Sequence, residues 1–165
     1  MKRLYILRHA KSSWDDASLA DFDRPLNDRG RESAPLMGRL MRDRGYIPDV
    51  AIASPAKRAK KTAKLALEAA DINASILFDE RVYEASTQTL VNILSGVDDK
   101  AESAMIVGHN PGMEGLVRTL TGESQEMPTA ALAVIDLNVD SWARVGHETG
   151  TLIEVLRPKE LGNLR

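Results

Sequence analysis

Apolar runs of strand length alternate along the chain with longer stretches in which apolar residues recur at helical spacing. The apolar runs predict buried strands at Leu4–Leu7, Val50–Ala53, Ser75–Phe78, Ala104–Val107, Ala131–Leu137 and Thr151–Leu156. The amphipathic stretches predict helices from about Asp28 to Arg44, from Pro55 to about Ala70, from about Thr87 to Leu94, and from just after the fourth strand to about Leu120. Strands that alternate with helices are typical of an α/β fold.

Proline, glycine and serine mark the expected ends of two helices. Gly45 follows the first predicted helix and is a natural C-cap, because glycine readily adopts the left-handed backbone that ends many helices. Ser54 is a suitable N-cap for the second helix, and Pro55 fits its first position. Pro35 lies within the first helical pattern, so it should either kink that helix or lie in the first turn of a shorter helix capped by Ser33.

The order of the predicted elements indicates a three-layer α/β/α sandwich. Helices between most of the strands favour a mostly parallel central sheet. No helix signal separates the last two strands, so we expect an antiparallel edge there. No internal repeat, low-complexity segment or linker divides the sequence. We therefore expect a single domain over residues 1–165, with a loose tail after about residue 158.

Composition argues against several classes of function. The chain has 165 residues, 43% of them hydrophobic, and its 22 basic and 24 acidic residues give a formal net charge of −2. This balance argues against a nucleic-acid-binding protein, which usually carries a basic excess. The absence of cysteine excludes disulfides, thiolate nucleophiles and cysteine-bound zinc. No apolar run approaches the length of a membrane span, and the run after Met-Lys-Arg is too short for a signal peptide. We expect a cytoplasmic protein that binds no membrane.

Basic and imidazole side chains follow three of the predicted strands. Arg8 and His9 come directly after the first strand, Ser54 and Arg58 after the second, and His109 after the fourth. The carboxyl ends of parallel strands meet at one edge of an open sheet, where ligands bind. If these strands are neighbours, two imidazoles and two guanidinium groups converge in one pocket. Such a cluster is suited to an anion with a charge near −2.

Phosphate fits this combination of side chains. The planar guanidinium of arginine matches phosphate oxygens, and Arg58 is expected in the first turn of its helix, where backbone N–H groups and the helix dipole add positive potential. Phosphoryl transfer spreads charge over three oxygens and is catalysed largely by positioning and charge stabilisation. An imidazole held in one tautomer can attack phosphorus directly. The residues therefore indicate phosphoryl-transfer chemistry.

Three motifs resemble those of a known family. Residues Leu7–Ser12 (Leu-Arg-His-Ala-Lys-Ser) resemble the Arg-His-Gly signature of the histidine phosphatase superfamily, with alanine in place of glycine as in a bacterial subgroup. Residues Ser54–Ala63 are similar to its second motif, and Val107–Asn110 to its last. The motifs keep the family's order, and the resemblance covers essentially the whole chain. Residues Ser12–Gly30 and the short length are most similar to SixA-type phosphohistidine phosphatases, which lack the insertions that roof the pocket of phosphoglycerate mutases.

The resemblance implies a phosphoglycerate mutase-like fold and a role for each motif residue. His9 would be phosphorylated during turnover, and Arg8 and Arg58 would bind the phosphoryl oxygens. His109 would contact the same oxygens and stabilise the transition state. Glu84 lies near the position where many members carry a proton donor.

Four further residues lie near these motifs or carry an imidazole. Lys11 and Ser12 are expected at the mouth of the pocket, where they would bind substrate. Asp15 stands where many relatives of the family have asparagine, and its negative charge argues against direct contact with phosphate. His147 lies in a glycine-rich turn and is expected on the surface.

The sequence therefore predicts a metal-independent phosphatase without a cofactor. In the expected two-step hydrolysis, His9 takes the phosphoryl group and water then releases it, while Glu84 or the substrate's own imidazole supplies the leaving-group proton. The partner would be a phosphorylated protein, such as a histidine phosphotransfer protein, because a short chain should leave an open pocket.

Other functions stay open. One is a broad phosphomonoesterase that acts on small phosphoesters, and another is a non-catalytic adaptor that binds phosphate. A mutase is disfavoured because the chain has little spare length. The histidines lack the helical spacing of a zinc site, and no glycine-rich loop of a nucleotide-binding module follows the first strand.

Overall fold

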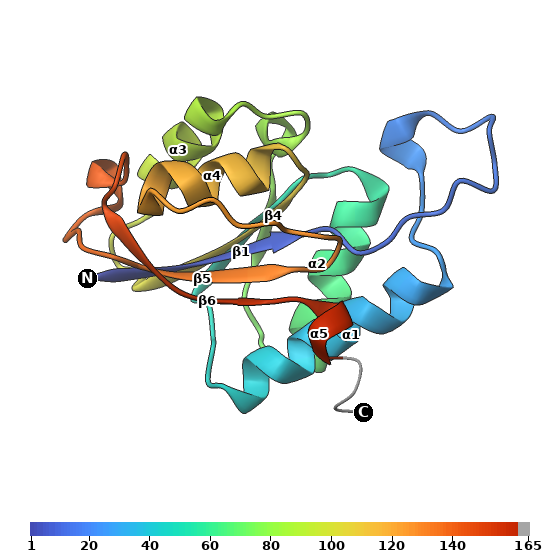
Figure 1. Cartoon of the computed structure of the whole chain (residues 1–165), viewed down its shortest axis with the longest axis horizontal. Helices are drawn as coiled ribbons and strands as arrows, with labels where there is room; N and C mark the ends of the chain where they lie inside the picture. The colour runs from blue at the N-terminus through green and yellow to red at the C-terminus, as the bar shows by residue number, and fades with distance from the viewer. Residues whose placement is uncertain (162–165) are drawn as a thin grey trace.

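The computed structural model describes residues 1–161 and contains a six-stranded mixed sheet with helices on both faces (Figure 1). The strands are β1 (Lys2–Arg8), β2 (Val50–Ala53), β3 (Ile76–Phe78), β4 (Ser103–Gly108), β5 (Leu132–Leu137) and β6 (Gly150–Leu156). The helices are α1 (Asp28–Asp43), α2 (Lys57–Ala69), α3 (Thr87–Ser95), α4 (Gly112–Thr121) and α5 (Pro158–Leu161). Single 3₁₀ turns lie at Asp21–Asp23, Glu80–Val82 and Trp142–Arg144.

The strand order β3-β2-β4-β1-β5-β6 places β4 between β1 and β2. Strands β1 to β4 are parallel to one another, whereas β5 pairs antiparallel with both β1 and β6. The predicted sandwich with a mostly parallel sheet and an antiparallel edge is thus confirmed. Val107 of β4 pairs with Leu7 on one side and with Ala53 on the other, so the carboxyl ends of the three strands lie level.

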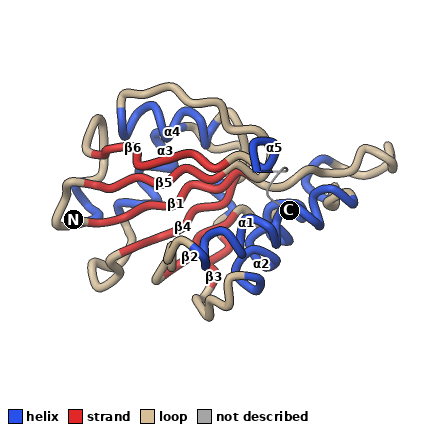
Figure 2. Tube along the Cα trace, turned by 60° about the horizontal axis from the view of Figure 1, so that its bottom comes forward, coloured by secondary structure: helices blue, strands red, loops and turns tan. Residues whose placement is uncertain are grey.

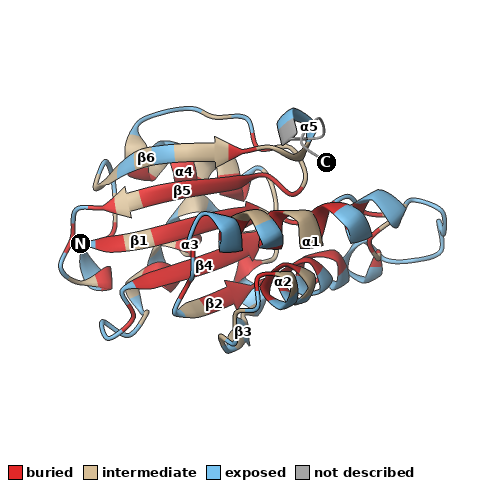
Figure 3. Ribbon diagram, turned by 90° about the horizontal axis from the view of Figure 1, so that it is seen from below, coloured by how far each residue is buried: buried red, intermediate tan, exposed pale blue. Residues whose placement is uncertain are grey.

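Alternating side chains of the strands build a separate core on each face of the sheet. In β1, Leu4 and Ile6 pack with residues of α3 and α4, whereas Tyr5 and Leu7 pack with residues of α1 and α2. Figures 1 and 2 show the two helix pairs on opposite sides of the sheet. Figure 3 shows buried residues concentrated in the central strands. The strands that carry the candidate residues therefore form the most enclosed part of the fold.

Helices α1 and α2 approach each other closely because small residues face one another. A Cβ atom on Gly38 would lie 2.0 Å from the carbonyl oxygen of Ala66, so a larger residue has no room there. The buried face of α2 also includes Ala59 and Ala63, which have no exposed surface. This contact fixes α2, and Arg58 with it, against the rest of the domain.

The start of α2 differs from the sequence prediction. The helix begins at Lys57, and its N-cap residue Ala56 makes no side-chain capping hydrogen bond. The predictions of Ser54 as N-cap and Pro55 as first helical residue are therefore wrong. The hydroxyl of Ser54 accepts a hydrogen bond from the Ala56 N–H at 3.2 Å and also contacts a histidine, so a neighbouring strand determines its role.

Helix α1 continues through Pro35. Its N-cap is Asn27, whose side chain accepts a hydrogen bond from the Gly30 N–H. The alternative of a shorter helix capped by Ser33 is therefore wrong, and Ser33 is buried inside the helix. Gly45 follows the helix with a φ of 72°, as expected for a glycine that ends a helix.

Regular secondary structure follows β6. Where the sequence predicts a loose tail after about residue 158, Pro158–Leu161 form the short helix α5. Arg157 anchors its start, because the guanidinium donates to the Glu160 carboxylate at 3.3 Å and to the Glu126 carbonyl at 3.0 Å. The rest of the predicted tail, residues 162–165, lies outside the described residues.

The segment between β1 and α1 projects beyond the carboxyl ends of the parallel strands (Figures 1 and 2). It includes the 3₁₀ turn Asp21–Asp23. Arg24 is buried at its base and donates hydrogen bonds to the Ser12 hydroxyl at 2.7 Å and to the Ser13 carbonyl at 3.0 Å. The same guanidinium lies 3.2 Å from the ring centroid of the exposed Trp14. These contacts hold the projecting segment in a defined conformation.

Candidate active site

The predicted convergence of residues after three strands is present. His9 follows β1, Ser54 follows β2 and His109 follows β4. The His9 N–H donates to the Gly108 carbonyl at 3.0 Å, and the Ser54 N–H donates to the Val107 carbonyl at 3.0 Å. Backbone hydrogen bonds to β4 therefore fix the chain on both sides at the point where the candidate side chains begin.

The side chain of His9 is held in one tautomer. Its Nδ1 lies 2.7 Å from the backbone carbonyl of Ala10. Because a carbonyl oxygen only accepts hydrogen bonds, Nδ1 carries the hydrogen, and Nε2 of the neutral ring keeps a free electron pair. The Ala10 N–H in turn donates to the Thr62 hydroxyl at 2.9 Å, and this hydroxyl donates to the Arg58 carbonyl at 2.7 Å. Thr62 therefore ties the segment that orients His9 to helix α2.

Burial keeps His9 neutral. The residue is 7% exposed, and burial lowers its pKa to about 4. The hydrogen bond to Ala10 opposes this shift, whereas the positive charges of Arg58, Arg8 and Arg24 add to it. At neutral pH the Nε2 electron pair is thus available for attack on an electrophile.

His109 lies beside His9, and the two ring centroids are 5.1 Å apart. Its Nε2 lies 2.8 Å from the hydroxyl of the fully buried Ser54. This hydroxyl accepts the Ala56 N–H and has no other acceptor for its own hydrogen among the described residues, so donation to Nε2 satisfies both groups and leaves the ring hydrogen of neutral His109 on Nδ1. Among the described residues, the buried Nδ1 has no hydrogen-bond partner. It is therefore a donor that an anion could use.

The pKa of His109 is lowered to about 3. Burial is the main cause, and the charges of His9 and Arg58 contribute, whereas Asp21 opposes the shift. The ring of Tyr83 packs edge-on against His109 with the centroids 5.4 Å apart. Both histidines of the cluster are thus neutral at physiological pH, and the positive charge is left to the arginines.

Arg58 lies in the first turn of α2, as predicted, and contacts a carboxylate that the prediction did not include. Its Nη1 donates to the Asp21 backbone carbonyl at 2.7 Å, and its Nη2 donates to Asp21 Oδ2 at 2.9 Å. Tyr83 donates its hydroxyl hydrogen to the same oxygen at 2.6 Å, and Arg24 Nη1 donates to Oδ1 at 3.2 Å. Asp21 thus joins the projecting segment to the cluster.

Arg8 makes its contacts with the loop that precedes β5. Its Nη1 donates to the Met127 carbonyl at 3.1 Å, and the same oxygen accepts a hydrogen bond from Asn110 Nδ2 at 2.9 Å. The buried Nε of Arg8 has no partner among the described residues. Burial lowers the pKa of Arg8, and the charge of Glu114 opposes this.

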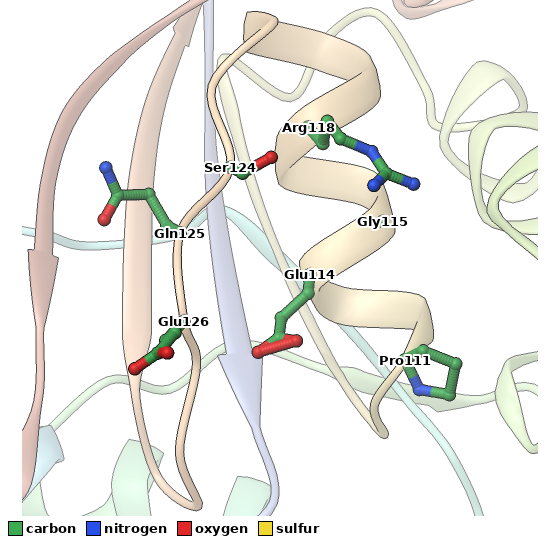
Figure 4. Close-up of a pocket in the computed structure, with 7 residues that line it drawn as sticks. All are labelled: Pro111, Glu114, Gly115, Arg118, Ser124, Gln125 and Glu126. Atoms are coloured by element: carbon green, nitrogen blue, oxygen red, sulfur yellow. The ribbon is translucent and has the colours of Figure 1, made fainter.

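Glu114 belongs to a hollow of about 300 Å³ between α4 and residues 124–126 (Figure 4). In this view its carboxylate extends from the helix toward the segment that carries Glu126. Glu114 Oε1 accepts the Met127 N–H at 2.9 Å. The Glu114 carboxylate that lines this hollow therefore holds the backbone of Met127, whose carbonyl accepts the hydrogen bond from Arg8.

A cavity of about 410 Å³ opens over the cluster. Asp21 and Arg58 contribute to its lining, together with Tyr83, Glu84 and His109. His9 and Arg8 do not contribute to this lining: His9 is buried beside His109, which is partly exposed. The arrangement presents a neutral nucleophilic nitrogen, two guanidinium groups and an unpartnered imidazole N–H, which together can bind a tetrahedral anion and accept its central atom.

Comparison with known proteins shows which family the chain belongs to. A sequence profile of the histidine phosphatase superfamily (branch 1) matches residues 4–92, which include the first two motifs. An uncharacterised chloroplastic protein of Arabidopsis thaliana is 33% identical over 150 residues, which cover 86% of this chain and 69% of its own length. The chain belongs to the histidine phosphatase superfamily.

Solved structures agree with this assignment. A protein from Agrobacterium tumefaciens described as a candidate phosphohistidine phosphatase SixA is 32% identical and matches with a TM-score of 0.83 over 95% of this chain and 98% of its own. A protein histidine phosphatase SixA complexed with tungstate matches with a TM-score of 0.84 at 22% identity, over 96% of this chain and 99% of its own. The predicted phosphoglycerate mutase-like fold, of the SixA kind, is therefore confirmed.

In this histidine phosphatase, Glu84 and Asp15 lie in different surroundings. Glu84 lines the cavity and is exposed, with a φ of 56° that is uncommon for a residue other than glycine. Asp15 is exposed on the projecting segment, and its N–H donates to the Ser13 hydroxyl at 3.1 Å.

Lys11 and Ser12 do not contribute to the lining of the cavity. Ser12 is buried with its hydroxyl bonded to Arg24, and Lys11 is exposed, with a carbonyl that accepts the Asn27 N–H at 3.0 Å. Their role in substrate binding stays a prediction. His147 is exposed, as expected, with 79% of its side chain accessible.

Two residues of the cluster, Asp21 and Tyr83, are not among the predicted site residues, although Asp21 begins the Asp-Phe-Asp-Arg run within the polar segment and Tyr83 directly precedes Glu84. Ser54 lies at its strand end as predicted, but its hydroxyl contacts His109 and it is not the N-cap of α2. Since serine is common at both sites, the sequence alone carries no signal that separates a cap from a histidine partner.

Within residues 1–161, no three histidine, aspartate or glutamate side chains are grouped as potential ligands of a metal ion. Within the same residues, no helix is both long and apolar enough to cross a lipid bilayer.

Proposed function

We propose that this histidine phosphatase hydrolyses phosphohistidine in proteins, through a covalent intermediate on His9. The observation that carries the proposal is the hydrogen bond from His9 Nδ1 to the Ala10 carbonyl at 2.7 Å. It leaves Nε2 as the nucleophile, and the lowered pKa of His9, about 4, keeps this nitrogen unprotonated at neutral pH.

In the first step, the Nε2 electron pair of His9 forms a bond to phosphorus while the bond to the leaving group breaks. Arg8, Arg58 and the Nδ1–H of His109 stabilise the charge on the phosphoryl oxygens. In the second step, a water oxygen attacks the phosphohistidine, inorganic phosphate leaves, and the electron pair returns to Nε2. The mechanism requires no metal ion or cofactor, because the side chains supply the charge.

We assign the leaving-group proton of ester substrates to Glu84. It lines the cavity and is exposed there, so its carboxyl group can reach a leaving group. For a phosphohistidine substrate, the leaving imidazole can carry its own proton. A cytoplasmic location and a phosphorylated protein partner, such as a histidine phosphotransfer protein, complete the proposal.

The preference for a protein substrate is supported by the similarity to two SixA proteins, a candidate phosphohistidine phosphatase and a protein histidine phosphatase, and by exposed apolar residues on the projecting segment. Trp14, Leu19 and Phe22 are 78%, 37% and 37% exposed on the projecting segment. A protein surface could cover them, whereas a small ester could not. The alternative of a small-molecule phosphomonoesterase is favoured by one observation, the modest cavity volume of about 410 Å³.

The proposal is tested with metal-free protein and two substrates, a phosphohistidine-bearing phosphotransfer protein and para-nitrophenyl phosphate. His9→Ala should abolish turnover of both, by at least about 10⁴-fold, because it removes the nucleophile. His147→Ala, which changes an exposed histidine in the same way, should retain full activity. Fast dephosphorylation of the protein with slow ester hydrolysis is the expected result for wild type.

Other outcomes would change the assignment. Substantial metal-free activity in His9→Ala would exclude His9 as the nucleophile. Rapid ester hydrolysis with slow protein dephosphorylation would support the phosphomonoesterase. Phosphate binding without turnover of either substrate would support an adaptor.

A further inference from the structure

We propose that Asp21 makes this enzyme selective for phosphohistidine over phosphate esters, by accepting a hydrogen bond from the ring N–H of the leaving imidazole. The inference rests on the proposed phosphohistidine activity. It assigns a substrate-contacting role to the Asp-Phe-Asp-Arg run of the projecting segment, which the mechanism above does not use.

The contacts of Asp21 leave one acceptor position of its carboxylate without a partner. Oδ2 accepts two hydrogen bonds, from Arg58 and Tyr83, whereas Oδ1 accepts one, from Arg24. A carboxylate oxygen has two acceptor positions, so Oδ1 keeps one. No further partner of Oδ1 occurs within residues 1–161. The side chain is 49% exposed and belongs to the lining of the cavity, so a substrate atom can reach it.

The network also determines what Asp21 can do chemically. The hydrogen bond from Tyr83, together with Arg58 and Arg24, lowers the pKa of Asp21 to about 2, although burial opposes the shift. The group is therefore a carboxylate at any physiological pH. It has no proton to give to a departing alkoxide, but it is an acceptor held in place by three donors.

A phosphohistidine leaving group needs such an acceptor. When the substrate ring is protonated, one ring nitrogen carries phosphorus and the other carries hydrogen. His9 Nε2 forms its bond to phosphorus while the P–N bond breaks, and that electron pair remains on the leaving nitrogen. The product is neutral imidazole, which keeps its N–H, so no proton is transferred in the step. A carboxylate bonded to this N–H stabilises the cationic ring that is the reactive form.

The same carboxylate disfavours an ester. As a P–O bond breaks, negative charge develops on the leaving oxygen and is repelled by Asp21. Asp21 therefore discriminates through the leaving group, and its effect should differ in direction or size between the two substrate classes.

The test compares phosphoimidazole with para-nitrophenyl phosphate, two small probes that remove any effect of protein docking. Asp21→Asn should lower kcat/KM for phosphoimidazole by about tenfold to a hundredfold, the usual size of a lost charged hydrogen bond. The kcat/KM for para-nitrophenyl phosphate should fall by a clearly smaller factor, because its leaving group makes no hydrogen bond to Asp21. Misplacement of Arg58 would lower both rates alike, so the ratio of the two rates isolates the role of Asp21.

Asp23→Asn is the matched control, because Asp23 is an exposed carboxylate in the same turn. It should leave the ratio unchanged. An unchanged ratio in Asp21→Asn would overturn the inference while a wild-type preference for phosphoimidazole left the proposed function intact. A wild type that hydrolyses only the ester would overturn both. If circular dichroism shows that Asp21→Asn is unfolded, Asp21→Ser removes the same carboxylate from this exposed turn and is judged by the same ratio.

Discussion

The orientation of His9 depends on the backbone of the next residue. The Ala10 carbonyl takes the place of the carboxylate that orients many catalytic histidines, and it brings no negative charge close to the ring. The imidazole is therefore oriented without a counter-charge that would favour its protonated form. His109 is oriented differently, by the hydroxyl of Ser54.

Ser54→Ala should lower kcat without unfolding the protein. The substitution removes the hydroxyl that holds His109 Nε2, so the ring hydrogen is no longer confined to Nδ1. We expect kcat to fall by about tenfold to a hundredfold, which is typical of a misplaced group in an active site. Nitrogen-15 NMR of the His109 ring should report a change of tautomer that a purely structural role for Ser54 would not cause.

Ser103→Ala supplies the comparison. Ser103 is also buried, and it bonds the Asp49 N–H at 3.0 Å and the Ile47 carbonyl at 3.1 Å, at the opposite end of β4. The Ser103→Ala variant should be less stable than wild type but should keep the wild-type kcat. Equal values of kcat in wild type and Ser54→Ala would contradict the positioning role.

The residues that could be predicted from sequence are those fixed by strand ends. Arg8, His9 and His109 follow apolar runs directly, so a correct strand places them at the correct edge of the sheet. Asp21 could not be found in this way, because it reaches Arg58 through an irregular segment whose path depends on tertiary contacts such as the burial of Arg24.

At the scale of elements, the site depends on a close fit between two helices. Helix α2 presents a face of alanines to α1, and Gly38 of α1 has no side chain that would clash with the Ala66 carbonyl. The antiparallel edge was predictable because no helical pattern separates its strands. The start of α2 was not, because the Ser54 hydroxyl, which accepts the Ala56 N–H, also bonds to His109 after a neighbouring strand, a tertiary contact that the local sequence does not indicate.

Gly38→Ala should destabilise the fold. The new methyl group would lie 2.0 Å from the Ala66 carbonyl oxygen, which belongs to rigid backbone, so α1 or α2 must shift. We expect the free energy of unfolding to decrease by about 1–3 kcal/mol, the usual cost of overpacking. Urea denaturation followed by circular dichroism measures this change.

Gly146→Ala tests the specificity of that effect, because a Cβ atom there meets nothing within 4 Å. It should change the free energy of unfolding by no more than about 0.5 kcal/mol. A Gly38→Ala protein as stable as wild type would show that the helices can separate without cost.

At the scale of the whole molecule, folding buries two neutral histidines among arginines. The pKa values of about 4 for His9 and about 3 for His109 lie well below the value of about 6.5 expected in the unfolded chain. At pH values between the folded and the unfolded pKa of each histidine, the unfolded state binds more protons than the folded state. Stability is therefore full above pH 6.5 and decreases as the pH falls.

We expect the free energy of unfolding to decrease by about 2 kcal/mol per buried histidine between pH 7 and pH 5, a window above the ordinary range of carboxylates. Urea denaturation at a series of pH values measures the slope. His9→Ala should reduce it by about half, whereas His147→Ala should leave it unchanged, since His147 is exposed. A pH-independent stability in this window would mean that the histidines are not buried in their neutral form.

The candidate residues on the sheet and those on the loops belong to separate segments of the chain, and this separation affects how the molecule can be altered. The proposed nucleophile and the arginines proposed to bind phosphate are attached to strand ends and to α2, whereas Asp21, Tyr83 and Glu84 lie on connecting segments that line the cavity. Grafting a new segment between β1 and α1 would replace the surface proposed to meet the leaving group without disturbing a core strand. Directed evolution toward new substrates should therefore concentrate its libraries on residues 13–25 and 79–86.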